Sequence, residues 1–115
     1  MAYYYLALAA EKTNDVPRAI SILRDVVGHY PDYAQAHEAL GTVLLKDRQY
    51  SQAEASLRKA IQLDPNLLQA HYQLGRLLGR VGKEQESQAE LEIARRLEHD
   101  QRARKAQQIH LEMPE

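Results

Sequence analysis

A seven-residue segment of the chain returns 34 positions later. Residues 35–41 read QAHEALG, and residues 69–75 read QAHYQLG. The same offset aligns further turn and apolar residues: Pro31 with Pro65, Ala19 with Ala53, and Leu23 with Leu57 and Leu91. A period of 34 residues is typical of stacked helix-turn-helix units, because one such unit cannot bury its apolar face alone. The repeat therefore predicts a helical solenoid.

The composition favours the same class. With 115 residues, of which 44% are hydrophobic, the chain can bury one core. That core must come from Leu, Ala, Ile, Val and Tyr, since the sequence has no Phe, Trp or Cys. Such residues favour closely packed helices and an all-α fold. The lack of Cys excludes disulfides, thiolate catalysis and Cys-type zinc sites, and it leaves the compartment open.

The charged residues nearly balance, with 15 Lys and Arg against 16 Asp and Glu and a formal net charge of −1. No field of the whole molecule would therefore attract nucleic acid or an anionic membrane. The chain also lacks an apolar run of the ~20 residues that span a bilayer, and its start has no secretory leader pattern. We predict neither nucleic-acid nor membrane binding. Because the first repeat begins at once, we expect the chain to be part of a longer protein.

Turn residues divide the chain into helices. Apolar side chains at helical spacing predict helices over residues 2–13, 33–46, 50–63, 67–80 and 84–97, and one from about Asp15 to Pro31. Asp32 and Asn66 each follow a proline, where we expect them to cap the next helix. Gly41 and Gly75 lie inside predicted helices, where Gly costs about 1 kcal/mol against Ala. A close crossing with a neighbouring helix is the reason we expect for both.

The residues of each repeat fall into the columns of the tetratricopeptide repeat (TPR), written W-x2-L-G-x2-Y, then A-x3-F, then P. The second repeat has Leu40, Gly41, Leu44, Ala53, Leu57, Ala60 and Pro65 there. The third has Leu74, Gly75, Leu78, Leu91 and Ala94, and the first has Leu6, Ala7, Ala19, Leu23 and Pro31. The departures are Tyr3, His37 and His71 in the Trp column, Ser87 for Ala and His99 for Pro. The chain thus resembles the TPR family over almost its whole length.

This resemblance implies an all-α, right-handed solenoid of three TPR repeats, over residues 1–33, 34–67 and 68–101, folded as one unit. It also implies a capping helix and tail over 102–115, because a final repeat needs a polar outer surface. The helix can begin at Asp100, and we expect its inner face to hold Ala103, Ala106, His110 and Met113. We interpret the cations nearby as a solvated outer face, with an anionic partner as the alternative: Arg95, Arg96, Arg102, Arg104 and Lys105.

The same resemblance implies a concave groove lined by the first helix of each pair. Helical geometry independently puts Glu38, Thr42 and Leu45 on a face other than the Leu40 and Leu44 stripe. We expect a protein or peptide partner, held by apolar contacts and by carboxylate contacts to Arg76 and Arg80. The groove residues are Tyr4, Leu8, Lys12, Glu38, Thr42, Leu45, Lys46, Gln69, Tyr72, Arg76 and Arg80.

The sequence offers no catalytic constellation. It has no G-x-S-x-G, Gly-rich phosphate loop or H-E-x-x-H, and its carboxylates are spread along predicted solvated faces. His37 and His71 occupy equivalent columns, but packed helices lie roughly 8–10 Å apart, too far for both to bind one ion comfortably. We interpret them as partly buried side chains that occupy the space taken by Trp in other repeats of the family. We therefore predict no enzyme activity, cofactor or metal site.

Three functions stay open. A protein-interaction module is the leading interpretation. A spacer or substrate-docking segment of a larger enzyme or assembly factor is the second. Self-association through Tyr3, Tyr4 and Tyr5 is the third, which gives a monomer or a weak homodimer. The clamp for heat-shock chaperones is disfavoured, because its Lys, Asn and Arg columns hold Tyr4, Leu8, Ala39, Gln69 and Gln73.

Overall fold

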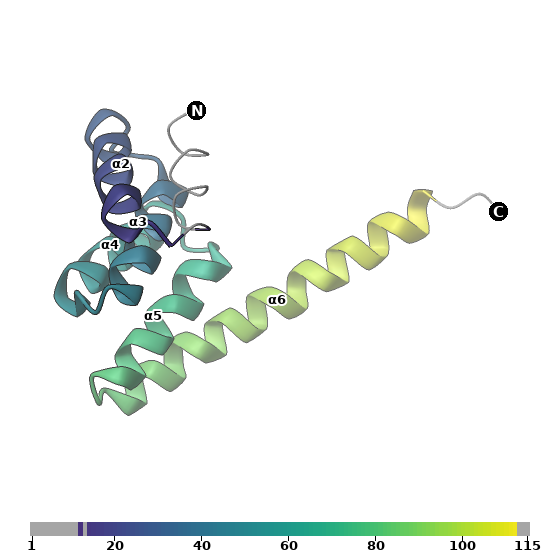
Figure 1. Ribbon diagram of the computed structural model, residues 1–115. Coiled ribbons are helices and arrows are strands. Elements are labelled where there is room, and N and C mark those ends of the chain that lie inside the picture. Colours follow the sequence, from purple (N-terminus) through teal and green to yellow (C-terminus); the bar gives the residue numbers. More distant parts are fainter. Residues whose placement is uncertain (1–11, 13, 113–115) are drawn as a thin grey trace.

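The chain forms a curved stack of helices. We describe residue 12 and residues 14–112 of a computed structural model (Figure 1). Over this part of the chain the structure has helices and no strand. The helices are α2 (Val16–His29), α3 (Ala34–Lys46), α4 (Tyr50–Leu63), α5 (Leu68–Arg80) and α6 (Glu84–Glu112). The predicted all-α class is confirmed, whereas the helix expected over 2–13 lies outside the described residues except for Lys12.

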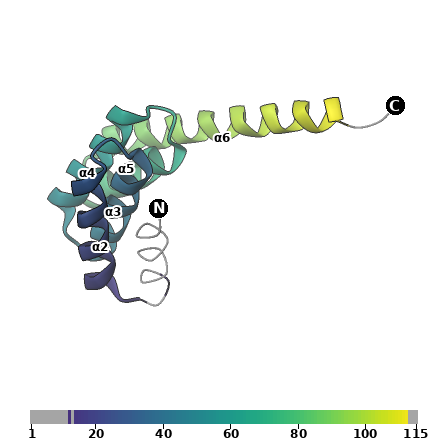
Figure 2. The ribbon, with the colours of Figure 1, turned by 90° about the horizontal axis from the view of Figure 1, so that it is seen from above.

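Neighbouring helices pair in the order of the sequence. α3 packs most extensively against α4, and α5 against α6, so each pair forms a helical hairpin. α2 packs on α3, α4 packs on α5, and α3 also touches α5. Figures 1 and 2 show these hairpins stacked one after another. This arrangement is the solenoid that the 34-residue period predicts.

The core repeats with the sequence period. Leu23 and Leu57, one period apart, are 1% and 0% exposed, and Ala19 and Ala53 are both fully buried. The largest fully buried side chains are Leu23, Val43, Leu44, Leu57, Leu74, Leu77 and Leu78. Each comes from the apolar stripe of its helix, so hydrophobic periodicity of 3.6 residues accounts for the packing.

The two mid-helix glycines lie at close helix crossings. A Cβ atom at Gly41 would lie 2.6 Å from Leu57 Cγ, and one at Gly75 would lie 2.7 Å from Leu91 Cγ. Both distances are too short for carbon atoms in contact. Glycine therefore lets the two helices of each hairpin approach closely, as predicted.

A left-handed residue lies in the turn before each of α2, α4 and α6. Asn14, Arg48 and Gly82 have φ values of 62°, 61° and 86° and stand 34 positions apart. At Arg48 the chain forms a Schellman motif, because the Gln49 N–H donates to the Leu44 carbonyl at 2.9 Å and the Arg48 N–H to Leu45 at 3.1 Å. Two of the three positions hold Asn or Gly, which tolerate this conformation.

The predicted helix caps differ from those observed. Tyr33 and Leu67 are the N-cap residues of α3 and α5, and neither they nor Asp15 at α2 makes a side-chain cap hydrogen bond. Asp32 and Asn66 instead lie inside turns, which close through N–H bonds from Tyr33 to Tyr30 O and from Leu67 to Asp64 O, both 3.1 Å. The helices therefore begin later than the position directly after each proline.

The C-terminal segment differs from the separate capping helix expected from about residue 100. α6 continues through this region to Glu112 without a break. His99 has the backbone N–H that proline lacks, so the helix need not stop there, and Arg102 pairs with Glu98 at 2.7 Å one turn away. Ala103 and Ala106 are exposed rather than packed inward, and the side chain of His110 and all of Met113 lie outside the described residues. Figures 1 and 2 show this half of α6 extending away from the hairpins.

None of the helices described here is both long enough and apolar enough to span a bilayer.

Candidate functional site

Residues of α3 and α5 converge on one cleft of about 300 Å³, which we name the basic cleft. Its walls come from two consecutive hairpins, because α3 and α5 are the first helices of their pairs and lie in contact. The lining residues are Thr42, Leu45 and Lys46 of α3, Arg48 of the following turn, and Gln73, Arg76 and Arg80 of α5.

The structure brings five of the predicted groove residues together in this cleft: Thr42, Leu45, Lys46, Arg76 and Arg80. Glu38 lies one turn before Thr42, and its carbonyl and carboxylate oxygens are 3.0 and 3.1 Å from the Thr42 hydroxyl. Gln69 and Tyr72 are exposed on α5 outside the cleft lining. Lys12 is exposed as well. Tyr4 and Leu8 lie outside the described residues, as do the three tyrosines proposed for self-association.

Helical spacing aims these side chains into the cleft. Thr42, Leu45 and Lys46 are three and four residues apart on α3, and Arg76 and Arg80 are four apart on α5. Leu45 is only 4% exposed and belongs to the core, so it forms an apolar floor rather than a free anchor. The cleft thus combines an apolar base with polar walls.

The cleft is positively charged. Four of its described lining residues are cations, and no Asp or Glu is among them. The Arg76 guanidinium lies 5.8 Å from the centre of the Tyr72 ring, a cation–π contact that helps to orient it. Within the described part of the chain, Arg48 and Arg80 have no carboxylate within ion-pair distance. A ligand entering the cleft would therefore meet these two arginines without a carboxylate partner from the described residues.

Sequence reasoning missed Arg48 and Gln73 as cleft residues. Gln73 stands in a helix column that another TPR subfamily uses, and Arg48 lies in a turn rather than on a helix. A signal for Arg48 was present in the period, since the equivalent positions hold Asn14 and Gly82. An arginine in a column of turn formers marks the position as unusual.

The two histidines of the Trp column bind backbone rather than each other. His71 is 5% exposed, its Nε2 lies 2.7 Å from the Pro65 carbonyl oxygen, and its Nδ1 lies 2.6 Å from Glu90 Oε2. His37 is half-buried, and its Nε2 lies 2.8 Å from the Pro31 carbonyl oxygen. His37 is partly buried, as the sequence predicts, whereas His71 is more deeply buried than expected. Among the described residues, no group of three potential metal ligands occurs.

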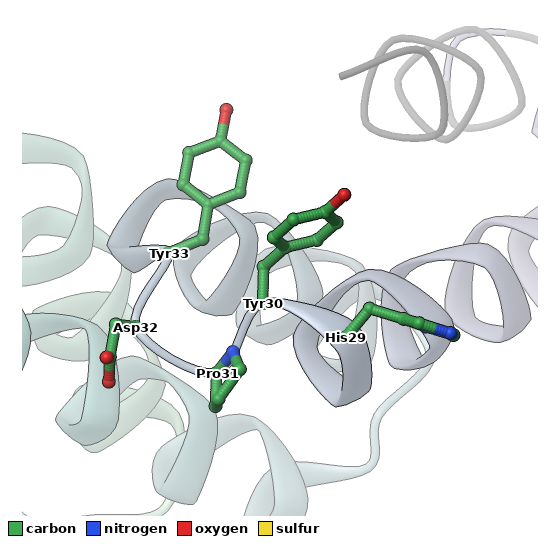
Figure 3. Close-up of a pocket in the computed structure, with 5 residues that line it drawn as sticks. All are labelled: His29, Tyr30, Pro31, Asp32 and Tyr33. Atoms are coloured by element: carbon green, nitrogen blue, oxygen red, sulfur yellow. The ribbon is translucent and has the colours of Figure 1, made fainter.

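A second hollow, of about 540 Å³, lies over the turn between α2 and α3 (Figure 3). Residues 29–33 line it, and Tyr30 is 54% exposed. Figure 3 shows the Tyr30 and Tyr33 rings on one side of the backbone and Asp32 on the other. The hollow offers aromatic surface but few polar groups aimed at one point, so the basic cleft is the better candidate site.

Solved structures of known proteins share this fold. A chain titled MamA 41-end from Desulfovibrio magneticus RS-1 matches with a TM-score of 0.81 and 27% identity, covering 88% of this chain and 57% of that one. An O-GlcNAc transferase of Thermobaculum terrenum matches with a TM-score of 0.82 and 29% identity, over 86% of this chain and 19% of that one. The second TPR of Spaghetti, bound to an HSP90 peptide, has a TM-score of 0.81 at 22% identity, over 84% of this chain and 89% of that one. At such low identity the last likeness shows the fold alone.

Sequence relatives lead to the same family. Mouse Superkiller complex protein 3 is 40% identical over 55 residues, which are 48% of this chain and 4% of that protein. The chain therefore spans a small part of this relative and little more than half of the MamA chain. The family model described as tetratricopeptide repeat matches residues 4–67. Because this match covers more than half of the sequence, the chain belongs to the tetratricopeptide repeat family.

Proposed function

We propose that this chain binds a peptide segment of a partner protein in the groove that contains the basic cleft. The TPR fold is a protein-interaction module, and it generally works as a non-catalytic scaffold, although one structural neighbour is a glycosyltransferase. The observation that carries the proposal is the convergence of α3 and α5 on one cleft with an apolar floor and cationic walls. A partner segment lying there would contact two repeats at once.

The chemistry of the groove suits an extended or helical peptide. Leu45 supplies apolar surface at the base, and Tyr72, which is 43% exposed, supplies an aromatic ring on the same helix as Arg76. Arg76 and Arg80 can donate charge-assisted hydrogen bonds to carboxylates. The Spaghetti TPR, which is bound to a peptide in its solved structure, supports a peptide as the kind of ligand for this fold.

The experiment is a selection of linear peptides from a phage-displayed random library on the whole chain. Affinities of the selected peptides are then measured by fluorescence anisotropy. We expect the double variant Arg76→Glu and Arg80→Glu to weaken binding at least ~10-fold, because two favourable contacts become repulsive. Lys59→Glu on α4, an exposed position away from the cleft lining, is the matched control.

The double variant must first be shown to be folded. Arg76 and Arg80 are exposed, so we expect the helical circular dichroism of the variant to match that of the unchanged chain. If the folded double variant binds the selected peptides as well as the Lys59→Glu control does, the groove is not the binding surface. If no linear peptide can be selected, peptide binding itself is wrong.

A second candidate function is that of a spacer or substrate-docking segment in a larger enzyme or assembly factor. It is favoured by the small share of its longer relatives that the chain covers, 4% of the mouse protein and 19% of the transferase chain. Comparing the activity of the full-length gene product with and without these 115 residues would test it. A docking arm would change the Michaelis constant for protein substrates, whereas a spacer would not.

A further inference from the structure

We propose that α6 is a self-association surface, and that its outer face pairs in antiparallel orientation with the same face of a second copy of this chain. The inference goes beyond the proposed function, because α6 contributes no lining residue to the basic cleft. It also differs from self-association through the tyrosines at positions 3–5, which lie at the other end of the sequence.

One face of α6 is not covered by any other described helix. Among these helices only α5 packs against α6, and it does so on the side that holds the buried Ser87, whose hydroxyl donates to the Gly75 carbonyl at 2.7 Å. Ala94 is buried on the same side. At about 3.6 residues per turn, an exposed row of residues lies on the opposite side. We name this row the outer stripe: Gln85, Ala89, Glu92, Arg96, His99 and Ala103.

The second half of α6 has little support from the rest of the chain. Residues 98–109 are all exposed, and Figures 1 and 2 show this half projecting from the hairpins. Isolated helices shorter than about 12–15 residues are only marginally stable in water. A second helix lying along this half would supply the kind of contact that α5 supplies to the first half.

The charges of α6 are divided along its length. Residues 84–93 contain four glutamates and no Lys or Arg, whereas residues 94–105 contain five Lys or Arg and two acids. An antiparallel partner helix therefore places the acidic half of each copy beside the basic half of the other. A parallel partner in register would place like charges together. The charge pattern thus favours a second copy of α6 as the occupant, in antiparallel orientation.

The outer stripe defines one register for this pairing. When Glu92 faces Arg96 of the second copy, Ala89 faces His99 and Gln85 faces Ala103, so stripe residues meet stripe residues throughout. The two-fold symmetry of such a dimer forms each of these contacts twice. Moving the pairing by one heptad in either direction loses both contacts between Glu92 and Arg96. The contacts therefore select the register as well as the orientation.

Interactions within the chain do not account for this central pair. In the described part of the chain Arg96 has no carboxylate within ion-pair distance, and Glu92 pairs with Arg95 at 2.8 Å. The helix dipole favours Glu84 and Glu86 in the first turn, but its effect does not extend as far as Glu92. Because a carboxylate has two oxygens, Glu92 can hold Arg95 of its own helix and Arg96 of the second copy together. This contact also limits repulsion between the two copies of Arg95 near the two-fold axis.

The first test measures sedimentation of the whole chain at concentrations up to about 1 mM, which detects a dissociation constant in the millimolar range. We expect a monomer–dimer equilibrium. Glu92→Arg and Arg96→Glu should each weaken the dimer at least ~10-fold, because each substitution makes two contacts repulsive. An equimolar mixture of the two variants should restore the dimer, since opposite charges then meet at both contacts. Lys59→Glu on α4, also an exposed charge reversal, is the matched control and should change nothing.

The second test reports the orientation, and it uses the absence of Cys from the sequence. Mild oxidation of a mixture of Gln85→Cys and Ala103→Cys chains should link one copy of each variant. Either variant alone should not link, because the antiparallel register holds the two copies of residue 85 about 27 Å apart along the helix. A disulfide needs Cα atoms within about 7 Å. Lys59→Cys is the control for links formed by random collision.

The outcomes separate this inference from the proposed function. A chain that stays monomeric up to about 1 mM, or a dimer that neither charge reversal weakens, would overturn the inference. Disulfides formed by Gln85→Cys alone, or a mixture of the charge variants that stays monomeric, would overturn it as well. Glu92 and Arg96 are exposed, so circular dichroism should show both charge variants to be folded. Peptide binding is tested separately through Arg76 and Arg80, and its result does not depend on the dimer.

Discussion

His71 donates its Nε2 hydrogen to the carbonyl oxygen of Pro65, with 2.7 Å between the two atoms. A carbonyl oxygen can only accept, so this nitrogen must be the protonated one. His37 makes the same contact with Pro31 at 2.8 Å, one period earlier. Where other family members place a large indole, this chain places a residue that joins the first helix of a repeat to the turn before it.

This relationship predicts a cost for removing the His71 ring nitrogens. His71→Phe would fill a similar space but would leave the Pro65 carbonyl without its side-chain donor and Glu90 without its partner at 2.6 Å. We expect a loss of about 2 kcal/mol in the free energy of unfolding, measured by urea denaturation. His37→Phe is the matched control, and we expect it to cost less because His37 is half-buried and has one such bond. Equal losses in both variants would contradict this account.

The close crossing at Gly41 predicts that a single methyl group is harmful. In Gly41→Ala the new Cβ would lie 2.6 Å from Leu57 Cγ, so α3 and α4 must move apart. We expect destabilisation of about 1–3 kcal/mol by urea denaturation. Gly28→Ala in α2 meets nothing within 4 Å, and we expect it to be neutral or to stabilise by about 0.5–1 kcal/mol. If both substitutions stabilised the protein, the crossing of α3 and α4 would have space for a methyl group, contrary to this prediction.

The left-handed turns predict opposite signs for two substitutions. Arg48→Gly relieves a disfavoured φ of 61°, and we expect it to raise the free energy of unfolding by about 0.5–1 kcal/mol. Gly82→Ala introduces a Cβ at a φ of 86°, and we expect it to lower stability by about 1 kcal/mol. Both changes in the free energy of unfolding are measured by chemical denaturation. A less stable Arg48→Gly variant would mean that the arginine side chain stabilises the fold.

The exposed half of α6 predicts local unfolding without global unfolding. Residues 98–109 are all exposed, so Gln101→Pro should break the helix there and leave the hairpins intact. We expect a lower circular dichroism signal at 222 nm with an unchanged midpoint of thermal unfolding. Leu74→Ala, in the fully buried core, serves as the contrast and should lower the midpoint clearly. A large drop in the midpoint for Gln101→Pro would show that this segment supports the core.

The sequence period was sufficient to predict most of the fold. Leu57 is fully buried, and Gly41 meets it at a close crossing, because both follow from repeating apolar and small residues. Helix starts were harder to predict, since Asp32 lies in a turn whose closure depends on Tyr30 and Tyr33. The length of α6 was also not predicted. The repeat places a helix-ending proline at this position, and the period alone does not say whether the helix continues when His99 replaces that proline.

The cleft was predictable in part. Arg76 and Arg80 follow from the helical period of α5, which places them on one face. Helical spacing could not identify Arg48, because its side chain reaches the cleft from a turn, and only the repeat period with Asn14 and Gly82 marked this position. Leu45 was expected among the groove residues, and it lies at the base of the cleft with only 4% of its surface exposed.

Because α6 is continuous, its exposed half forms a rigid extension from the third hairpin. Ala94 is the last buried residue of this helix over residues 84–109, whose exposure is described, and from there to Glu112 the axis rises by about 27 Å at 1.5 Å per residue. A rotation of about 10° where α6 meets α5 would swing the far end by about 5 Å, by the same geometry. Any small rotation at the third hairpin is thus amplified with distance along the exposed turns of α6.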